Sequence, residues 1–139
     1  MTRDDAYKIL TKYLTNKNLI KHCFAAEAVM KALARKLRVQ NSELRVDEET
    51  WGIVGLLHDA DYELSKGHPE KHGLLLFEKE PNTIPEDIAH AIKSHNFENT
   101  KVQPKSIMDW AITCSDQLTG LIVACALVHP DKKLASLTP

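Results

Sequence analysis

The stretch GLLHDADYE, residues 55–63, places an adjacent histidine and aspartate, His58 and Asp59, at the end of an apolar run. Asp47 can cap a helix that continues through this run. A buried helix that ends in an imidazole and a carboxylate is costly unless both groups find partners. A divalent cation satisfies both, because neutral imidazole and ionised carboxylate are good metal ligands. The stretch therefore predicts a helix that delivers two metal ligands.

Two adjacent ligands cannot complete a coordination sphere, so facing helices have to supply the others. Apolar residues recur every three to four positions over 19–38, which predicts a long helix that carries His22 near its start. A second apolar segment, 107–128, contains Asp116. An ionised aspartate inside an apolar helix needs a partner, and a metal is the strongest one available. His22 and Asp116 are therefore the predicted additional ligands.

The remainder of the chain also predicts helices. Residues 3–14 show helical spacing, Pro69 suits the first turn of a fourth helix that carries His72, and Pro85 suits the first turn of a fifth that ends near His95. Strand-like alternation with turn pairs is missing. We therefore expect an all-α fold. The residues predicted to cap helices are Asn18, Asp47 and Ser106.

Composition limits the class of protein and its partners. The chain has 139 residues, 43% of them hydrophobic and 27% charged, as expected for one globular domain. Its net charge of −1, with acids and bases interspersed, predicts neither a nucleic-acid nor a membrane partner. The charged N-terminus, MTRDDAYKIL, lacks a secretory apolar region, so we expect a cytoplasmic protein. The side chains predicted to pack in the core include Cys23, Cys114, Cys125, Trp51 and Trp110.

The order of these ligands resembles a known family. His22, then His58-Asp59, then the distant Asp116 resembles the HD-domain superfamily of metal-dependent phosphohydrolases. GLLHDADYE, HPEKHG, AIKSHN and CSDQLTGLIVACALVHP look like landmarks of small bacterial HDIG-type predicted hydrolases. The resemblance implies one compact HD-domain helical bundle over residues 1–139, and it leaves open a further C-terminal helical extension. It also implies hydrolysis of a phosphate ester or nucleotide by a metal-activated water.

Relatives with two metals add two histidines between the His-Asp pair and the final aspartate. His72 and His95 match these positions, which implies that Asp59 bridges two ions. We therefore expect one or two divalent ions per chain, with Mn, Fe, Zn, Co, Ni and Mg as candidates. The ligand set implied by the resemblance is His22, His58, Asp59, His72, His95 and Asp116.

One departure from the family pattern concerns the substrate. Many binuclear relatives read His-Asp-x-Gly-Lys, whereas this chain reads His58-Asp59-Ala60-Asp61-Tyr62 and lacks both the Gly and the Lys. Lys66 and Lys93 are candidates to replace that charge. Asp61 and Glu63 either relay protons or cap a turn as loop acids. Candidate catalytic residues are Asp59, Asp61, Glu63 and Lys66, and candidate substrate-binding residues are Lys66, Lys93 and Asn96.

Three functions are therefore compatible with the sequence. The first is a phosphohydrolase whose partner is a small phosphorylated molecule or nucleotide. The second is a mixed-valence di-iron oxygenase, which the same six-ligand set implies in some HD proteins. The third is a non-catalytic metal-stabilised ligand-binding module, which the missing Lys favours. A homodimer is compatible with all three. His90 lies about 140° around its helix from His95, so the two are not expected to share an ion.

Overall fold

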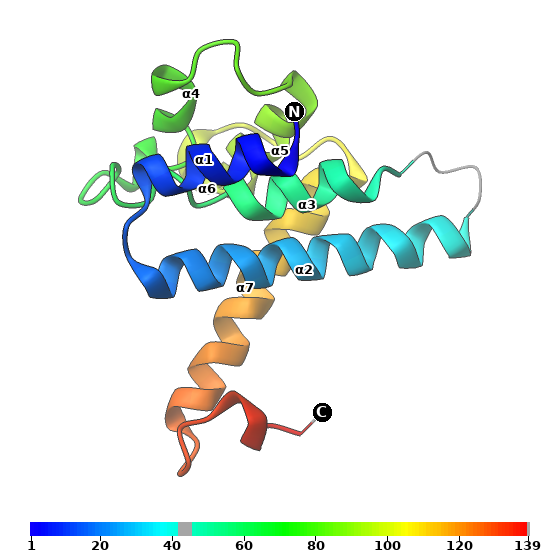
Figure 1. The fold of residues 1–139 in the computed structure, drawn as a ribbon, viewed down its shortest axis with the longest axis vertical. Coiled ribbons are helices and arrows are strands. Elements are labelled where there is room, and N and C mark those ends of the chain that lie inside the picture. Colours follow the sequence, from blue (N-terminus) through cyan, green and yellow to red (C-terminus); the bar gives the residue numbers. More distant parts are fainter. Residues whose placement is uncertain (42–45, 139) are drawn as a thin grey trace.

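The computed structural model describes residues 1–41 and 46–138, and within these ranges all regular structure is helical. The predicted all-α class is therefore confirmed. Figure 1 shows α2 and α3 side by side, with α1 packed over α3 and α7 crossing behind α2. The elements in order are α1 (Arg3–Tyr13), α2 (Lys17–Gln40), α3 (Glu48–Leu57), the 3-10 turn η1 (Pro69–Lys71), α4 (Leu75–Lys79), α5 (Glu86–His95), α6 (Phe97–Thr100), α7 (Ile107–Val128) and the 3-10 turn η2 (Leu134–Ser136).

Helix α3 lies at the centre of the fold. Residues 51–57 are all buried, and α1, α2, α5 and α7 all contact the helix. Gly55 allows this close packing, because a Cβ atom there would lie 2.6 Å from the carbonyl oxygen of Ala26 in α2. The end of α3 is therefore held inside the molecule and not at its surface.

The helix caps match two of three predictions. The side chains of Asp47 and Ser106 accept the backbone N–H of Thr50 and Asp109, so both predicted caps are confirmed. The prediction for Asn18 was wrong: Asn16 caps α2, because its Oδ1 accepts the N–H of Asn18 two residues later.

The fourth predicted helix is interrupted, and this prediction was wrong. Pro69 begins only the three-residue turn η1, and His72 follows that turn in an extended conformation. Gly73 then adopts a φ of +84°, which favours glycine, before α4 begins. The cause is tertiary, since the buried Asp61 carboxylate accepts the backbone N–H groups of Gly73 and Leu76.

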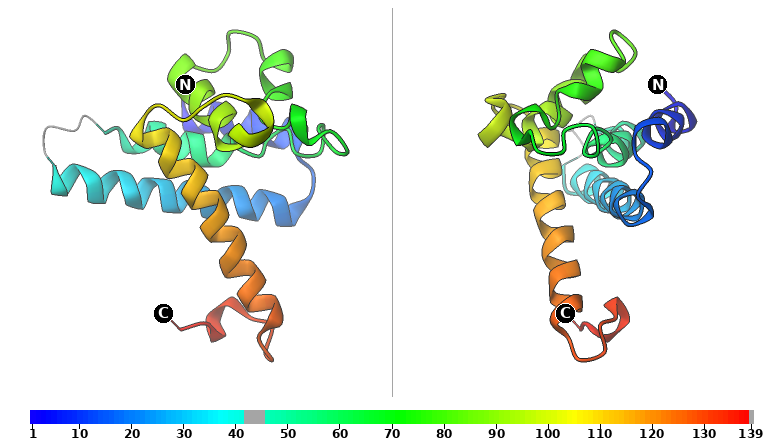
Figure 2. Two further views of the ribbon diagram at one scale, coloured as in Figure 1. Left: turned by 180° about the vertical axis from the view of Figure 1, so that it is seen from behind. Right: turned by 90° about the vertical axis from the view of Figure 1, so that its left-hand side faces the viewer.

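Several residues that were predicted to lie in the core are exposed. Cys23 and Trp51 are buried, but Trp110 is 52% exposed and Cys114 and Cys125 also face outward. All three exposed residues lie on α7. Trp110 and Cys114 lie on the face of α7 opposite the buried Ile112 and Thr119. Cys125 lies in the C-terminal half of α7, which projects from the other helices, with the segment containing η2 turned back beside it (Figure 2).

Candidate metal centre

Six polar side chains from separate elements meet at the end of α3. Helix α3 contributes His58, which ends it, and the following residue, Asp59. Helices α2 and α7 supply one side chain each, and the segment after η1 and the end of α5 supply the remaining two. The structure thus brings together every metal ligand predicted from the sequence. In chain order they are His22, His58, Asp59, His72, His95 and Asp116.

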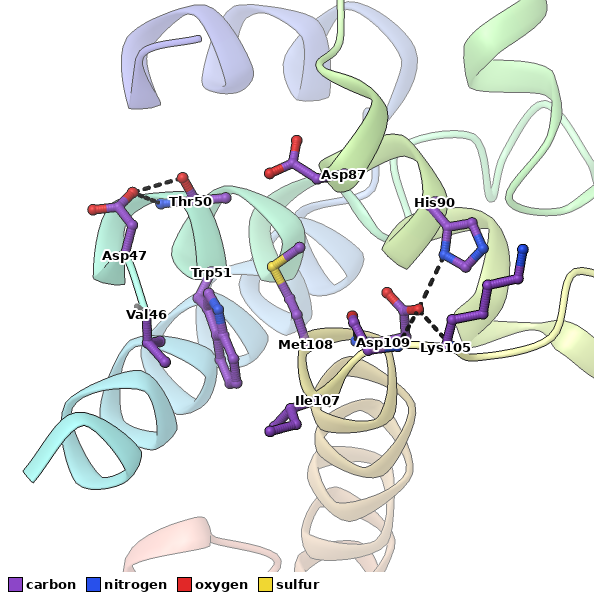
Figure 3. Close-up of a pocket in the computed structure, with 11 residues that line it drawn as sticks. Val46, Asp47, Thr50, Trp51, Asp87, His90, Lys105, Ile107, Met108 and Asp109 are labelled. Carbon is purple, nitrogen blue, oxygen red and sulfur yellow. Dashed lines mark hydrogen bonds and ion pairs between the residues drawn. The ribbon is translucent and has the colours of Figure 1, made fainter. Parts of the chain in front are cut away.

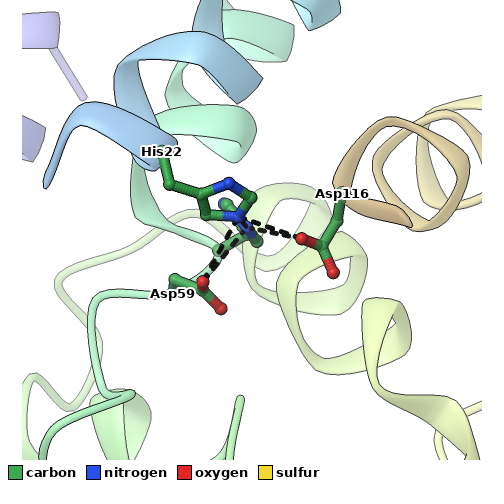
Figure 4. Close-up of side chains that lie close together, drawn as sticks. His22, Asp59 and Asp116 are labelled. Atoms are coloured by element: carbon green, nitrogen blue, oxygen red, sulfur yellow. Dashed lines mark hydrogen bonds and ion pairs between the residues drawn. The ribbon is translucent and has the colours of Figure 1, made fainter. Parts of the chain in front are cut away.

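The first group of donors consists of His22, His58, Asp59 and Asp116, whose ligand atoms all lie within 4.8 Å of one another. Nε2 of His22 lies 3.0 Å from Oδ1 of Asp116 and 3.4 Å from Oδ2 of Asp59. Nε2 of His58 lies 3.2 Å from Nε2 of His22. Figure 4 shows His22, Asp59 and Asp116 pointing toward a common point from three directions. This arrangement has the donors of a tetrahedral or larger cation site.

A second group shares Asp59 and adds two histidines. Oδ1 of Asp59 lies 3.0 Å from Nε2 of His72 and 3.9 Å from Nε2 of His95. The two imidazole nitrogens are 3.1 Å apart. The carboxylate of Asp59 therefore has one oxygen toward each group, as a bridging ligand requires.

The outer ring nitrogens of three histidines are already occupied. Nδ1 of His58 donates to the carbonyl of Gly55 at 2.8 Å, and Nδ1 of His95 donates to the carbonyl of Ile92 at 2.5 Å. Nδ1 of His72 lies 3.0 Å from Oδ1 of Asp61. Carbonyl and carboxylate oxygens accept hydrogen bonds, so the proton of each ring in its neutral form sits on Nδ1 and the Nε2 lone pair faces inward.

This donor set fits a divalent metal. Inward-facing Nε2 lone pairs repel one another and the Asp59 and Asp116 carboxylates unless a proton or a cation lies between them. Four imidazoles and two carboxylates form the mixed N/O environment that Zn, Mn, Fe and Co accept. The residues present therefore fit one or two such ions.

The electrostatics keep the carboxylates ionised. Burial raises the pKa of Asp59, but the neighbouring His58 and the hydrogen bond from His72 outweigh it and hold that pKa well below its usual range. Burial likewise raises the pKa of Asp116, but the neighbouring His22 and His58 outweigh it and hold that pKa well below its usual range. Both side chains are therefore available as anionic ligands at neutral pH.

The pKa values of the two histidines in the second group are shifted in opposite directions. Burial and the neighbouring His58 and His72 lower the pKa of His95 to about 4. Burial also acts to lower the pKa of His72, but hydrogen bonds to Asp59 and Asp61 raise it to about 9. In the metal-free protein the proton is therefore held at His72, and a metal ion would replace it.

The two acids after the His-Asp pair have different surroundings. Asp61 is 1% exposed and binds His72 together with the backbone N–H of Gly73. Glu63 instead accepts the backbone N–H groups of Thr15 and Asn16, both at 2.9 Å, and so ties the α1–α2 connection to this segment. Asp61 lies directly behind a candidate ligand, whereas the contacts of Glu63 are those of a loop acid that caps a turn.

A cavity of about 350 Å³ opens beside the second group. Asn96 lines it, and its Nδ2 donates to the carbonyl oxygens of Pro69 and His72 at 3.0 and 3.1 Å. Lys66 lines an adjoining hollow of about 220 Å³ that shares Asn96 and His72. Lys93 is placed differently, with Nζ 4.7 Å from the centre of the Phe77 ring.

Tyr62 also lines the cavity and was not predicted as a site residue. Its ring meets that of His72 edge-on, with 5.4 Å between centroids. A signal was present in the sequence, because Tyr62 stands where binuclear relatives of the His-Asp-x-Gly-Lys pattern carry the Lys. The remaining lining residues that sequence reasoning did not single out are Phe97, Glu98 and Gln117.

A larger cavity of about 500 Å³ lies elsewhere, between the starts of α3 and α7 (Figure 3). Its walls include Trp51 and Met108, and none of the six clustered ligands lines it. His90 reaches Asp109 there, with 3.0 Å between Nδ1 and Oδ2. The expectation that His90 and His95 do not converge on one point is confirmed.

Comparison with known proteins gives one match. The family model described as HD domain matches residues 19–129, which contain all six clustered side chains. No curated protein and no solved structure matches the chain.

Proposed function

The chain belongs to the HD-domain family, and on this premise we propose that it is a metal-dependent phosphohydrolase acting on a small phosphate ester or nucleotide. The family is one of metal-dependent hydrolases, and the clustered side chains of this chain could hold the metal. The family match does not specify a substrate, and a phosphorylated substrate is our proposal.

The observation that carries the proposal is the position of Asp59. Its two oxygens face two separate groups of histidines, 3.0 Å from His72 on one side and 3.4 Å from His22 on the other. When bound, divalent ions at such a site supply the positive charge that polarises a phosphoryl oxygen and acidifies water. Asp61 contributes by fixing the ring of His72.

The cavity beside the centre supports a small substrate. Its volume of about 350 Å³ lies at the lower end of the range for small-molecule sites. None of the described residues that line it is Lys or Arg. The positive charge opposite a phosphate would therefore come from the metal, with Asn96 and Tyr62 orienting the rest of the molecule. Lys66, in the adjoining hollow, is the nearest candidate to contact a larger substituent.

The experiment is metal-dependent turnover. The protein is stripped with a chelator, reloaded with Mn, Fe, Co, Ni, Zn or Mg, and assayed for phosphate release from phosphomonoesters, phosphodiesters and nucleotides. Turnover should return with metal in wild type and in His90→Ala, a control histidine outside the centre. It should be absent in Asp59→Asn. A fully loaded wild type that hydrolyses no member of the panel would contradict the proposal.

The same preparations separate the other two functions. The four-histidine, two-carboxylate set also suits iron, so an oxygenase would consume dioxygen only when loaded with iron. A non-catalytic module would bind nucleotides or phosphate esters without turnover under any metal. This alternative is supported by the cavity, because none of the described residues that line it is Lys or Arg.

A further inference from the structure

Helix α7 carries an apolar seam on the side that faces away from the metal centre. Successive members of the seam lie alternately four and three positions apart in the sequence, along the whole helix. Apart from Ala111, which is partly buried, all of them are exposed. Such a 3.5-residue repeat is typical of helices that pair with another helix. The seam consists of Ile107, Ala111, Cys114, Leu118, Leu121, Cys125 and Val128.

We propose that two copies of this chain pair through the α7 seam. The proposal is independent of the proposed function, since the seam and the candidate metal site occupy opposite faces of α7. Ile112, Ser115 and Thr119 are buried against the rest of the protein, and Asp116 points into the metal centre. At about 100° per residue, Ile112, Asp116 and Thr119 lie on the far side of the helix from the seam, and Ser115 lies between the two faces.

A lipid bilayer would not explain the pattern. Among the described helices, α7 alone is long and apolar enough to cross a membrane, with a mean hydropathy of 1.6. A bilayer, however, imposes no heptad spacing and favours a helix that is apolar all round. Asp109 and Asp116 instead occupy the inner face and are bound within the fold. Insertion would have to remove Asp116 from the metal centre.

The seam fits a copy of itself. It contains no charged side chain, so an identical partner brings no like-charge repulsion. In a two-fold antiparallel arrangement, Leu118 would face Leu121 of the second copy and Cys114 would face Cys125. Leu121 is 60% exposed and Val128 is 85% exposed.

The exposed area is also sufficient for a dimer. Trp110 and Ile122 flank the seam and are 52% and 42% exposed. With an area on the order of 70–100 Å² for each large side chain, the seam and its flanks offer roughly 700 Å². A specific protein–protein interface should bury more than about 1,000 Å² in total, or about 500 Å² per partner.

The first test is the oligomeric state of the metal-loaded full chain, measured by sedimentation velocity from about 1 to 100 µM. Wild type should be a dimer and Leu121→Glu a monomer. Leu127→Glu is the matched control, because Leu127 is 63% exposed on the same helix but lies about 180° around it from Leu118. It should remain a dimer. Circular dichroism and metal content check that both variants fold.

Two results of this test would overturn the proposal. The first is a wild type that stays monomeric throughout the concentration range. The second is a dimer that Leu127→Glu disrupts as strongly as Leu121→Glu, because the contact would then not follow the seam. Monomeric wild type that floats with phosphatidylcholine–phosphatidylglycerol vesicles would assign the face to lipid instead.

The second test uses the seam cysteines. Cys23 is buried, whereas Cys114 and Cys125 are exposed and free. A short bis-maleimide should join two chains through these thiols. Bonds between Cys114 and Cys125 indicate antiparallel helices, bonds between like cysteines indicate parallel helices, and both support pairing. The absence of any inter-chain product, with both thiols alkylated, would contradict it.

Discussion

Oδ1 of Asp61 lies 3.0 Å from Nδ1 of His72, and this contact directs Nε2 of His72 toward Asp59, also at 3.0 Å. Asp61 touches the remaining donors only through this ring, which makes it a positioning residue. Carboxylates behind a ligating histidine fix the orientation of its ring and raise its basicity.

Asp61→Asn should therefore weaken binding of one metal ion, by about 10- to 100-fold, while the other ion is retained. Isothermal titration of the metal-free protein with Mn²⁺ measures both affinities. Glu63→Gln is the matched control, since Glu63 binds Thr15 and Asn16, and it should leave both affinities unchanged. Equal losses in the two variants would show that Asp61 does not act through His72.

A second prediction concerns the packing of α3 on α2. A Cβ atom at Gly55 would lie 2.6 Å from the carbonyl oxygen of Ala26, and backbone atoms cannot move aside. Gly55→Ala should lower the free energy of unfolding by about 1–3 kcal/mol and weaken metal binding, because the two helices carry His58 and His22. Urea unfolding and metal titration measure the two effects.

Gly120→Ala is the control for this substitution. Nothing lies within 4 Å of a Cβ atom at Gly120 in α7. Its unfolding free energy should stay the same or rise by up to about 1 kcal/mol, from improved helix propensity. If Gly55→Ala were as stable as Gly120→Ala, this would contradict the close packing of α2 against α3 at Gly55.

The third prediction links metal to stability. Donors gathered from several helices exist together only in the folded state, so metal should raise the melting temperature in proportion to the logarithm of its free concentration. Asp59→Ala should remove most of this increase, because Asp59 belongs to both groups. Differential scanning fluorimetry with and without Mn²⁺ measures it. An undiminished shift in Asp59→Ala would place the metal effect elsewhere.

The fourth prediction is the pH dependence of the metal-free protein. The pKa of His72 is raised from 6.5 to about 9, so the folded state binds this proton more tightly than the unfolded state. The resulting stability is fully present below pH 6.5 and is lost as pH rises through 9. The melting temperature should therefore fall between pH 7 and 9.

Metal-loaded protein should show a smaller fall, because the metal ion replaces the proton. Asp61→Asn should also reduce the fall, since Asp61 is one of the causes of the raised pKa. A melting temperature of the metal-free wild type that is flat or rising over this pH range would contradict the prediction.

Much of the fold could be predicted because its signals are local. Asp47 and Ser106 precede apolar runs at helical spacing, so the starts of α3 and α7 follow from short-range capping. His22, His58, Asp59 and Asp116 could be predicted from their costly positions in apolar helices together with the family pattern, whereas His72 and His95 could be predicted from the family pattern alone. Neither argument requires knowledge of how the helices pack.

What could not be predicted depends on tertiary contacts. The break between η1 and α4 follows from Asp61, which takes backbone N–H groups more than ten residues away. The role of Glu63 depends on the α1–α2 connection, nearly fifty residues earlier. The spacing of hydrophobic residues on α7 indicates that the helix packs against something, but it does not indicate whether the partner is the same chain or another molecule.

The number of metal ions per chain tests the central claim most directly. Wild type reloaded with Mn²⁺ and freed of excess metal should contain about two ions per chain by inductively coupled plasma mass spectrometry. His72→Ala and His95→Ala should each contain about one ion, Asp59→Ala close to none, and His90→Ala two. Retention of wild-type metal by Asp59→Ala would contradict the account, because the side chain that joins both groups of donors would then not bind metal.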